Sequence, residues 1–335
     1  MTNQGFVAFS LGLLVMSCTG TTIPIGSQAS SSSSSGGVNT PRPAPNIMFV
    51  VDRSGSMEDN AEGVPGTCES ATGAYSGRGN DCKWNNLLDV LLGPAGGDGG
   101  FIAALDAQFN KSNDSVRLGL TNFSGSSNDP TSTADACSTG QVLVTVGAGN
   151  ESEISSQLLQ TIPAGGTPTA ATLAILTPAY PALDPSASVQ RANYLILLTD
   201  GAPNCNANFQ ASASNCSGDQ CTLGSCAAAD WNTSDCACFQ QLPPGLEVIP
   251  QGCLDQDAAV QAVAALNSGS NPIKTFVIGF GSVTTAPDAT ATLNQMGMAG
   301  GMNLSSGSGY SFYQASSASD LQAALNAVLG IMTNG

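Results

Sequence analysis

Ile47-Met48-Phe49-Val50-Val51, followed at once by Asp52-Arg53-Ser54-Gly55-Ser56, is the segment that most clearly indicates the fold of this chain. A continuous apolar run with β-branched and aromatic members is typical of a strand that is covered on both faces, as in a parallel sheet. One carboxylate and two hydroxyls then follow at alternate positions. Oxygen donors of this kind suit a hard divalent cation such as Mg²⁺, which keeps several of its waters.

Asp and Ser are also the usual residues of turns and helix N-caps, so this motif alone is a weak signal, and a copy kept only for capping is the alternative. Two more short motifs strengthen it, Gly166-Thr167-Pro168-Thr169 and Leu198-Thr199-Asp200-Gly201. Together the three motifs resemble the metal-ion-dependent adhesion site (MIDAS) of von Willebrand factor A (vWA) domains. The resemblance implies a divalent cation, Mg²⁺ before Mn²⁺ or Ca²⁺, and the metal ligands Asp52, Ser54, Ser56, Thr167 and Asp200.

Strand and helix patterns alternate along residues 46–335, which predicts an α/β fold with a doubly wound, mostly parallel sheet of about six strands and helices on both faces. The vWA resemblance implies the same fold. We expect strands at Ile47–Val51, Val116–Phe123, Val142–Val146, Asn193–Leu198, Ile273–Phe280 and Tyr310–Gln314. Helices are predicted at Lys83–Leu92, Phe101–Phe109, Glu151–Thr161, Thr169–Tyr180, Ala318–Met332 and Asp255–Leu266, where Asp255 is the expected N-cap.

Composition narrows the possible functions. The chain has no histidine, which excludes Ser-His-Asp and Cys-His nucleophile pairs and His-ligated zinc. Its net charge of −16 disfavours nucleic acids and anionic membrane surfaces as partners. Only 10% of the residues are charged, so the surface must consist mainly of small polar residues. This composition favours an exported protein. Histidine-based catalysis is therefore excluded, whereas chemistry with carboxylates or a metal-bound water is still possible; the resemblance to vWA domains implies a binding protein and not an enzyme.

The N-terminal segment predicts the location. The apolar stretch Phe6–Met16 is too short to span a bilayer, and Val15-Met16-Ser17-Cys18 resembles a bacterial lipobox. Residues 1–18 are thus expected to be a lipoprotein signal peptide with Cys18 lipidated, although the first residues lack Lys and Arg. Residues 19–45, rich in Ser and Pro, are a predicted flexible tether. We expect a lipid-anchored protein of the bacterial cell envelope, at the outer membrane or surface, or a secreted one if Cys18 is not lipidated.

If the sheet has the topology that the vWA resemblance implies, the segments that hold the ten further cysteines all leave the strands on the metal-bearing edge of the sheet. An exported protein favours disulfides over zinc or iron–sulfur ligation, but the sequence does not give the pairing. Seven of them fall in residues 201–254, a predicted irregular insertion that either caps the domain structurally or takes part in binding. The disulfide candidates are Cys68, Cys82, Cys137, Cys205, Cys216, Cys221, Cys226, Cys236, Cys238 and Cys253.

The resemblance implies metal-dependent recognition, in which a partner protein supplies an Asp or Glu to the cation. Two alternatives remain: a structural or envelope-assembly lipoprotein whose site is capped by one of its own loops, and a metal-dependent hydrolase. Arg53 is expected to be a solvated loop residue that points away from the site, or one that steers an acidic partner. The acidic residues that could hold a second cation or cap the site are Glu58, Asp59, Asp81, Asp219, Asp230 and Asp235.

Overall fold

The computed structural model describes residues 42–64, 82–94, 99–110, 114–125, 137–187, 189–206, 239–242, 245–248, 254–304 and 309–334. All of them belong to one compact unit that begins at Arg42. The predicted signal peptide, Cys18 and residues 19–41 of the predicted tether lie outside the described residues. Among the described helices, none combines the length and the apolar character that crossing a bilayer requires.

A six-stranded sheet forms the centre of this unit, in the order β3-β2-β1-β4-β7-β8. All of its neighbouring strands run parallel except β3, which is antiparallel to β2. The expected doubly wound sheet is therefore confirmed. The strands are β1 (Asn46–Asp52), β2 (Arg117–Phe123), β3 (Gln141–Gly147), β4 (Asn193–Thr199), β7 (Ile273–Phe280) and β8 (Tyr313–Ala315).

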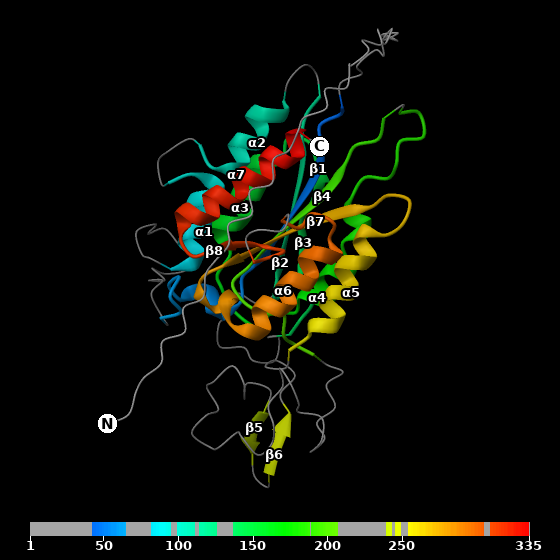
Figure 1. Ribbon diagram of the computed structural model, residues 1–335. Coiled ribbons are helices and arrows are strands. Elements are labelled where there is room, and N and C mark those ends of the chain that lie inside the picture. Colours follow the sequence, from blue (N-terminus) through cyan, green and yellow to red (C-terminus); the bar gives the residue numbers. More distant parts are fainter. Residues whose placement is uncertain are drawn as a thin grey trace, which may run out of the picture. The chain divides into compact units, whose positions relative to one another are not determined.

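Helices cover both faces of the sheet (Figure 1). Because alternate side chains of a strand point to opposite faces, β1 supplies both hydrophobic cores: Ile47 and Phe49 pack on one side, Met48 and Val50 on the other. One face carries α1 (Lys83–Leu92), α2 (Phe101–Phe109), α3 (Glu151–Gln160) and α7 (Ala318–Asn334). The other carries α4 (Thr169–Ala174), α5 (Gln256–Asn267) and α6 (Pro287–Ala299).

The strand order reverses direction between β1 and β4. From β1 the chain builds outward through β2 and β3, then returns to add β4, β7 and β8 on the opposite side of β1. Open α/β sheets bind their ligands at such a switch point, beyond the carboxyl ends of the strands. Asp52 ends β1, and Asp200 directly follows β4, so both carboxylates lie at this point.

The helices differ from expectation in two places. The helix predicted at Thr169–Tyr180 ends at Ala174 and gives way to a 3-10 turn, Thr177–Ala179, because Pro178 has no N–H to donate to the carbonyl of Ala174 and its ring would clash with that carbonyl in a continued α-helix. Asp255 stands at the N-cap of α5, as expected, although its side chain makes no capping hydrogen bond. α6 was not among the expected helices, although Pro287 opens it and Asp288 lies in its first turn, both of which are helix-start signals.

Two strand expectations also differ from the structure. The predicted strand Tyr310–Gln314 is shorter and later, since β8 covers Tyr313–Ala315. The insertion at 201–254, predicted to be irregular, contains the antiparallel pair β5 (Phe239–Leu242) and β6 (Gly245–Val248). The pattern in the sequence is short: β6 alternates apolar and polar residues only over Leu246-Glu247-Val248, and β5 has two successive glutamines, Gln240 and Gln241.

The last residues of the predicted tether contact the domain at the amino end of β1. The backbone N–H of Ala44 donates to Asp114 Oδ2 at 2.7 Å, and the carbonyl of Pro45 accepts from the backbone N–H of Arg117 at 3.1 Å. Arg191 donates to the Ala44 carbonyl and forms an ion pair with Asp114. The chain thus enters the domain at the amino end of β1, whereas Asp52 lies at the carboxyl end of the same strand.

Candidate metal site at the switch point

Asp52 is a fully buried carboxylate whose two oxygens each accept a hydrogen bond. The backbone N–H of Ser54 donates to Oδ1 at 2.8 Å, and the Thr199 hydroxyl donates to Oδ2 at 2.7 Å. The first bond closes the turn that carries the motif out of β1, and the second joins the ends of β1 and β4. These contacts fix the orientation of Asp52 at the switch point.

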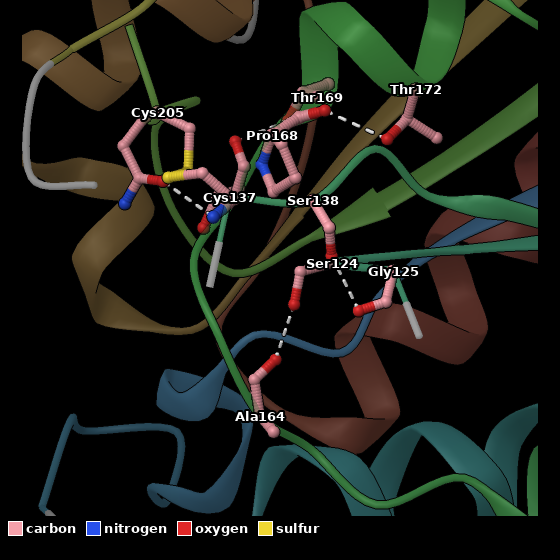
Figure 2. The surroundings of a disulfide bond; sticks show 11 residues. Ser124, Gly125, Cys137, Ser138, Ala164, Pro168, Thr169, Thr172 and Cys205 are labelled. Atoms are coloured by element: carbon pink, nitrogen blue, oxygen red, sulfur yellow. Dashed lines mark hydrogen bonds between the residues drawn. A yellow bond between two sulfur atoms is a disulfide. The ribbon is translucent and has the colours of Figure 1, made fainter. Parts of the chain in front are cut away.

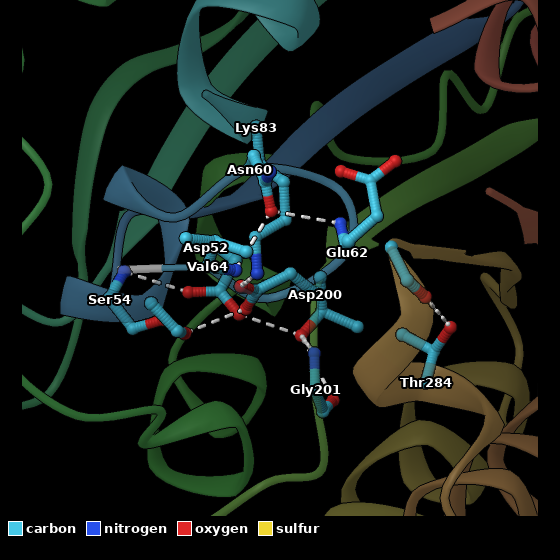
Figure 3. Close-up of polar contacts among 12 residues, drawn as sticks. Asp52, Ser54, Asn60, Glu62, Val64, Lys83, Asp200, Gly201 and Thr284 are labelled. Carbon is cyan, nitrogen blue, oxygen red and sulfur yellow. Dashed lines mark hydrogen bonds and ion pairs between the residues drawn. The ribbon is translucent and has the colours of Figure 1, made fainter. Parts of the chain in front are cut away.

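The two serine hydroxyls continue this group of oxygens toward Asp200. Ser54 Oγ and Ser56 Oγ are 3.1 Å apart, and the Ser56 hydroxyl donates to Asp200 Oδ1 at 3.0 Å. Asp52, Ser54 and Asp200 are at most 2% exposed, whereas Ser56 is exposed. The oxygen cluster is therefore buried on the protein side and reaches solvent at Ser56. Figure 3 shows Asp52, Ser54 and Asp200 close together.

The electrostatics of this cluster favour an added cation. The pKa of Asp52 is raised from 3.8 to about 7: burial is the main cause, the nearby charge of Asp200 adds to it, and the hydrogen bonds from Ser54 and Thr199 act in the opposite direction. Neighbouring buried carboxylates repel one another, so one of them holds a proton more readily than usual. A divalent cation between them would reverse this effect, because it stabilises both negative charges.

Lys83 is a functional residue that the sequence analysis missed. Its ammonium lies 2.5 Å from Asp200 Oδ2, and both side chains are almost completely buried (Figure 3). Lys83 is the first residue of α1, where a positive charge opposes the helix dipole. A lysine at the start of a helix was a signal in the sequence. The residue that pairs with Lys83, Asp200, lies 117 positions away along the chain, so the pair was not evident.

Thr167 reaches the same edge through its backbone. Its N–H donates to Asn204 Oδ1 at 2.6 Å, and its carbonyl accepts from the N–H of Asn204 at 3.0 Å. Just before it, the carbonyl of Gly165 accepts from the N–H of Gly55 at 3.0 Å, which joins this loop to the Asp52 motif. Among the described residues, no hydrogen bond joins the Thr167 hydroxyl to the other four predicted ligands. Asn204 is a second residue that the sequence analysis missed.

A disulfide between Cys137 and Cys205 links two loops at this edge, with a Cα–Cα distance of 5.4 Å (Figure 2). Cys137 precedes β3, and Cys205 directly follows Asn204. The expectation of a disulfide between segments at the carboxyl edge is confirmed for this pair. Cys82 is also disulfide-bonded, and the other candidate cysteines lie outside the described residues.

Arg53 is buried, which corrects the expectation of a solvated or steering residue. Only 3% of its surface is exposed. Its Nε donates to the carbonyl of Ser124 and its Nη1 to the carbonyl of Ile162, each at 2.9 Å. Arg53 therefore connects three loops at the carboxyl edge of the sheet, and its guanidinium is turned toward backbone carbonyls.

The donors present suit a hard divalent cation. Carboxylate and hydroxyl oxygens from Asp52, Ser54, Ser56 and Asp200 gather at one point, and Mg²⁺ combines one or two carboxylates with neutral oxygens and water. In the part of the chain that the structure describes, no group of three or more His, Cys, Asp or Glu is placed to hold a metal. Glu58 and Asp59 thus show no second cation site, and Asp81, Asp219, Asp230 and Asp235 lie outside the described residues.

The sheet order, the helices on both faces and the position of Asp52 and Asp200 define a vWA-like fold. No protein-family model matches the sequence, and no curated protein matches it either.

Solved structures show similarity of fold. The minor pilin PilB from Streptococcus sanguinis aligns with a TM-score of 0.50 and 15% identity, over 88% of this chain. The chain spans 62% of that pilin's length. The vWF domain of the type V pili tip protein Mfa5 from Porphyromonas gingivalis aligns with a TM-score of 0.49 and 12% identity, over 88% of this chain and 96% of that one.

A third similar structure is proximal thread matrix protein 1 from the mussel byssus, solved with a zinc-occupied MIDAS motif. It aligns with a TM-score of 0.40 and 13% identity, over 87% of this chain and 48% of that one. At 15% identity the likeness to PilB is one of fold and not of function.

Proposed function

We propose that this chain is a vWA-like binding protein that holds a divalent cation, Mg²⁺ before Mn²⁺ or Ca²⁺, and through it binds an acidic residue of a protein partner. Asp52 and Asp200 would supply charge, and Ser54, Ser56 and Thr167 would supply hydroxyl oxygens, directly or through water. The observation that carries the proposal is the unbroken series of oxygens from Ser54 through Ser56 to Asp200, beside the buried Asp52.

Binding follows from the mixed character of these donors. Neutral hydroxyls leave more positive charge on a metal than carboxylates do, and Mg²⁺ retains exchangeable water. A partner's Asp or Glu can replace such a water where the cluster reaches solvent, next to the exposed Ser56. The residual charge of the cation then favours an anionic ligand over a neutral one.

Catalysis has less support than binding. A hydrolase that activates a metal-bound water also needs a group to move protons, and the chain contains no histidine. Asp52, a carboxyl group with a raised pKa at the site, accepts hydrogen bonds at both oxygens and would itself be a metal ligand. We therefore place the protein among binding proteins and not among enzymes.

The proposed location is the bacterial cell envelope, with a lipid on Cys18 as the only membrane contact and residues 19–41 as the tether. The fold similarity to PilB, a pilin, agrees with a protein displayed outside the cell. Labelling of Cys18 with a clickable fatty acid, with Cys18→Ser as the control, tests the anchor separately from the metal site. Label that persists in Cys18→Ser, or that is missing from the wild type, would refute the lipid anchor.

Calorimetric titration of Mg²⁺ and Mn²⁺ into the chelator-treated chain, with its disulfides oxidised, tests the metal site. We expect saturable binding by one cation that Asp52→Asn abolishes. The amide keeps the shape of the side chain and removes its charge.

Asp320→Asn is the matched control, because Asp320 is an exposed carboxylate in the first turn of α7, outside the site. It should bind the cation as the wild type does. The proposed function is wrong if the wild type takes up no cation, or if Asp52→Asn takes it up unchanged.

A further inference from the structure

Lys83 places a fixed positive charge inside the proposed metal site. Its ammonium contacts Asp200 Oδ2, while the other oxygen of the same carboxylate, Oδ1, accepts from Ser56. Asp200 is therefore shared between an ammonium of the chain itself and the oxygen cluster that would hold a cation. Of the eight basic residues in the sequence, Lys83 is the one paired with a predicted metal ligand in the described part of the chain.

The position of Lys83 is fixed from several sides. Its backbone N–H donates to the carbonyl of Asp59 at 2.8 Å, and the preceding residue, Cys82, is disulfide-bonded. Its side-chain stem passes so close to Gly281 that a Cβ added there would lie 3.1 Å from Lys83 Cδ. The side chain is fully buried, so the ammonium cannot move into solvent without rearrangement of α1.

A charge balance shows what this ammonium does. With both carboxylates ionised, as in the metal-bound state, Asp52, Asp200 and Lys83 together carry a net charge of −1, and a divalent cation would bring the group to +1. Without Lys83 the same group would carry −2 before metal binding and 0 afterward. Lys83 thus weakens the attraction for the cation, and it also leaves more positive charge for an anion that binds afterward.

We propose that Lys83 is the specificity-determining residue of this site. It balances Asp200 in the metal-free protein, lowers the affinity for the divalent cation, and increases the attraction of the bound cation for a carboxylate. This inference rests on the proposed function for its metal-bound state. Its metal-free part depends only on the buried ion pair.

The metal-free part is tested by chemical unfolding in the presence of a chelator. Removing one partner of a buried ion pair leaves the other charge uncompensated, so Lys83→Met and Asp200→Asn should each be clearly less stable than the wild type. The double variant should recover much of that loss, because neither charge is then left alone. Strictly additive losses in the double variant would refute the coupling, even if Lys83→Met alone folds poorly.

The metal-bound part is tested with Mn²⁺ and acetate as probes. We expect Lys83→Met to bind Mn²⁺ on the order of tenfold more tightly than the wild type, by calorimetry. Acetate in the first shell of protein-bound Mn²⁺ shows enhanced relaxation of its methyl protons, and this enhancement should fall several-fold in the variant. Lys274→Met is the matched control, since Lys274 is an exposed lysine on β7, and it should change neither result.

The outcomes separate the two proposals. If the wild type binds Mn²⁺ and Lys83→Met binds it no more tightly, or relaxes acetate equally well, the role of Lys83 is refuted and the proposed function stands. If only Lys83→Met binds Mn²⁺, the proposed function is wrong for the natural chain. In that case the competition between Lys83 and the cation is upheld. The proposed effect of Lys83 on carboxylate binding is refuted, because the wild type then holds no cation to which a carboxylate could bind.

Discussion

The hydroxyl of Thr199 is the hydrogen-bond donor that holds the second oxygen of Asp52 in place. Thr199→Val keeps the shape of this side chain and removes the donor, so Asp52 Oδ2 loses its 2.7 Å partner. A hydrogen bond to a charged group contributes about 1.5–3 kcal/mol. We expect the affinity for Mg²⁺ to fall on the order of tenfold, measured by calorimetry. The control, Thr145→Val at an exposed position of β3, should leave the Mg²⁺ affinity unchanged. Equal affinities in the wild type, Thr199→Val and Thr145→Val would contradict a positioning role for Thr199.

Arg53 shows how a residue beside the site can act on stability. Its side chain supplies the hydrogen bonds to the carbonyls of Ser124 and Ile162. Arg53→Met preserves much of the apolar stem but leaves these carbonyls without that donor, at a cost of about 1–3 kcal/mol for each buried group. We expect a loss of about 2–4 kcal/mol in the free energy of unfolding, measured with urea. Arg42→Met is a control outside the loops that Arg53 joins. A loss below about 0.5 kcal/mol in Arg53→Met would contradict this role.

At the scale of elements, the Cys137–Cys205 disulfide supports the loop that presents Thr167. Cys205 follows Asn204, whose side chain and backbone both bond to Thr167. Replacing both cysteines by serine should lower the free energy of unfolding by about 2–5 kcal/mol, because the bridge closes a long loop. Thermal or urea unfolding of the oxidised proteins measures this. Equal stability of the two proteins would mean that the bridge adds nothing to the fold.

Asn204→Ala separates the position of Thr167 from the disulfide. The bridge remains, but the Thr167 N–H loses its side-chain acceptor at 2.6 Å. We expect Mg²⁺ affinity to fall several-fold, with most of the stability retained, since one hydrogen bond contributes about 1 kcal/mol. Asn326→Ala, at an exposed position of α7, is the control for the same substitution on the surface. Unchanged affinity in Asn204→Ala would contradict a role of the Asn204 side chain in positioning Thr167.

Sequence patterns predicted most elements because a buried strand or helix face shows a recognisable pattern of apolar residues. β1 and β4 are buried along their whole length, and their apolar runs are correspondingly continuous. α6 escaped prediction because its buried face includes Ala289, Thr292 and Gly297 as well as Leu293 and Met296, so the contrast between its faces is weak.

The candidate site was predictable only in part. Asp52, Ser54 and Ser56 follow one strand in a recognisable spacing, whereas the roles of Lys83, Thr199 and Asn204 exist only once the sheet brings distant segments together. Arg53 was misjudged for the same reason. An arginine next to a loop motif is usually solvated, but here backbone carbonyls from two other loops surround it.

At the scale of the whole domain, the Asp114–Arg191 ion pair secures the entry of the chain at the amino end of β1. Burial raises the pKa of Asp114, but the hydrogen bond from Ala44 and the hydrogen bond and charge of Arg191 outweigh it, so the pKa lies below its usual 3.8. The pair's contribution to stability is therefore present above about pH 3.8 and is lost as the pH falls through the lower folded value.

In Asp114→Asn, the free energy of unfolding should consequently depend less on pH in the acidic range. We expect the wild type to exceed the variant by about 1 kcal/mol or less near pH 6, because the pair is partly exposed, and the difference to vanish below the folded pKa. Urea unfolding at a series of pH values measures both curves. Glu153→Gln, an exposed change on α3, is the control. A difference that persists at the lowest pH would show that Asp114 acts through packing and not through its charge.

The entry of the chain at one end of β1 and the candidate site at the other have a mechanical consequence. A pulling force between residue 42 and an occupant of the site would run along β1, whose covalent backbone joins the two points directly. Hydrogen bonds to β2 and β4 flank this strand along its length, so displacement would have to shear both ladders together and could not open them one bond at a time. Such a domain would transmit tension through its centre while its outer helices carry little of it.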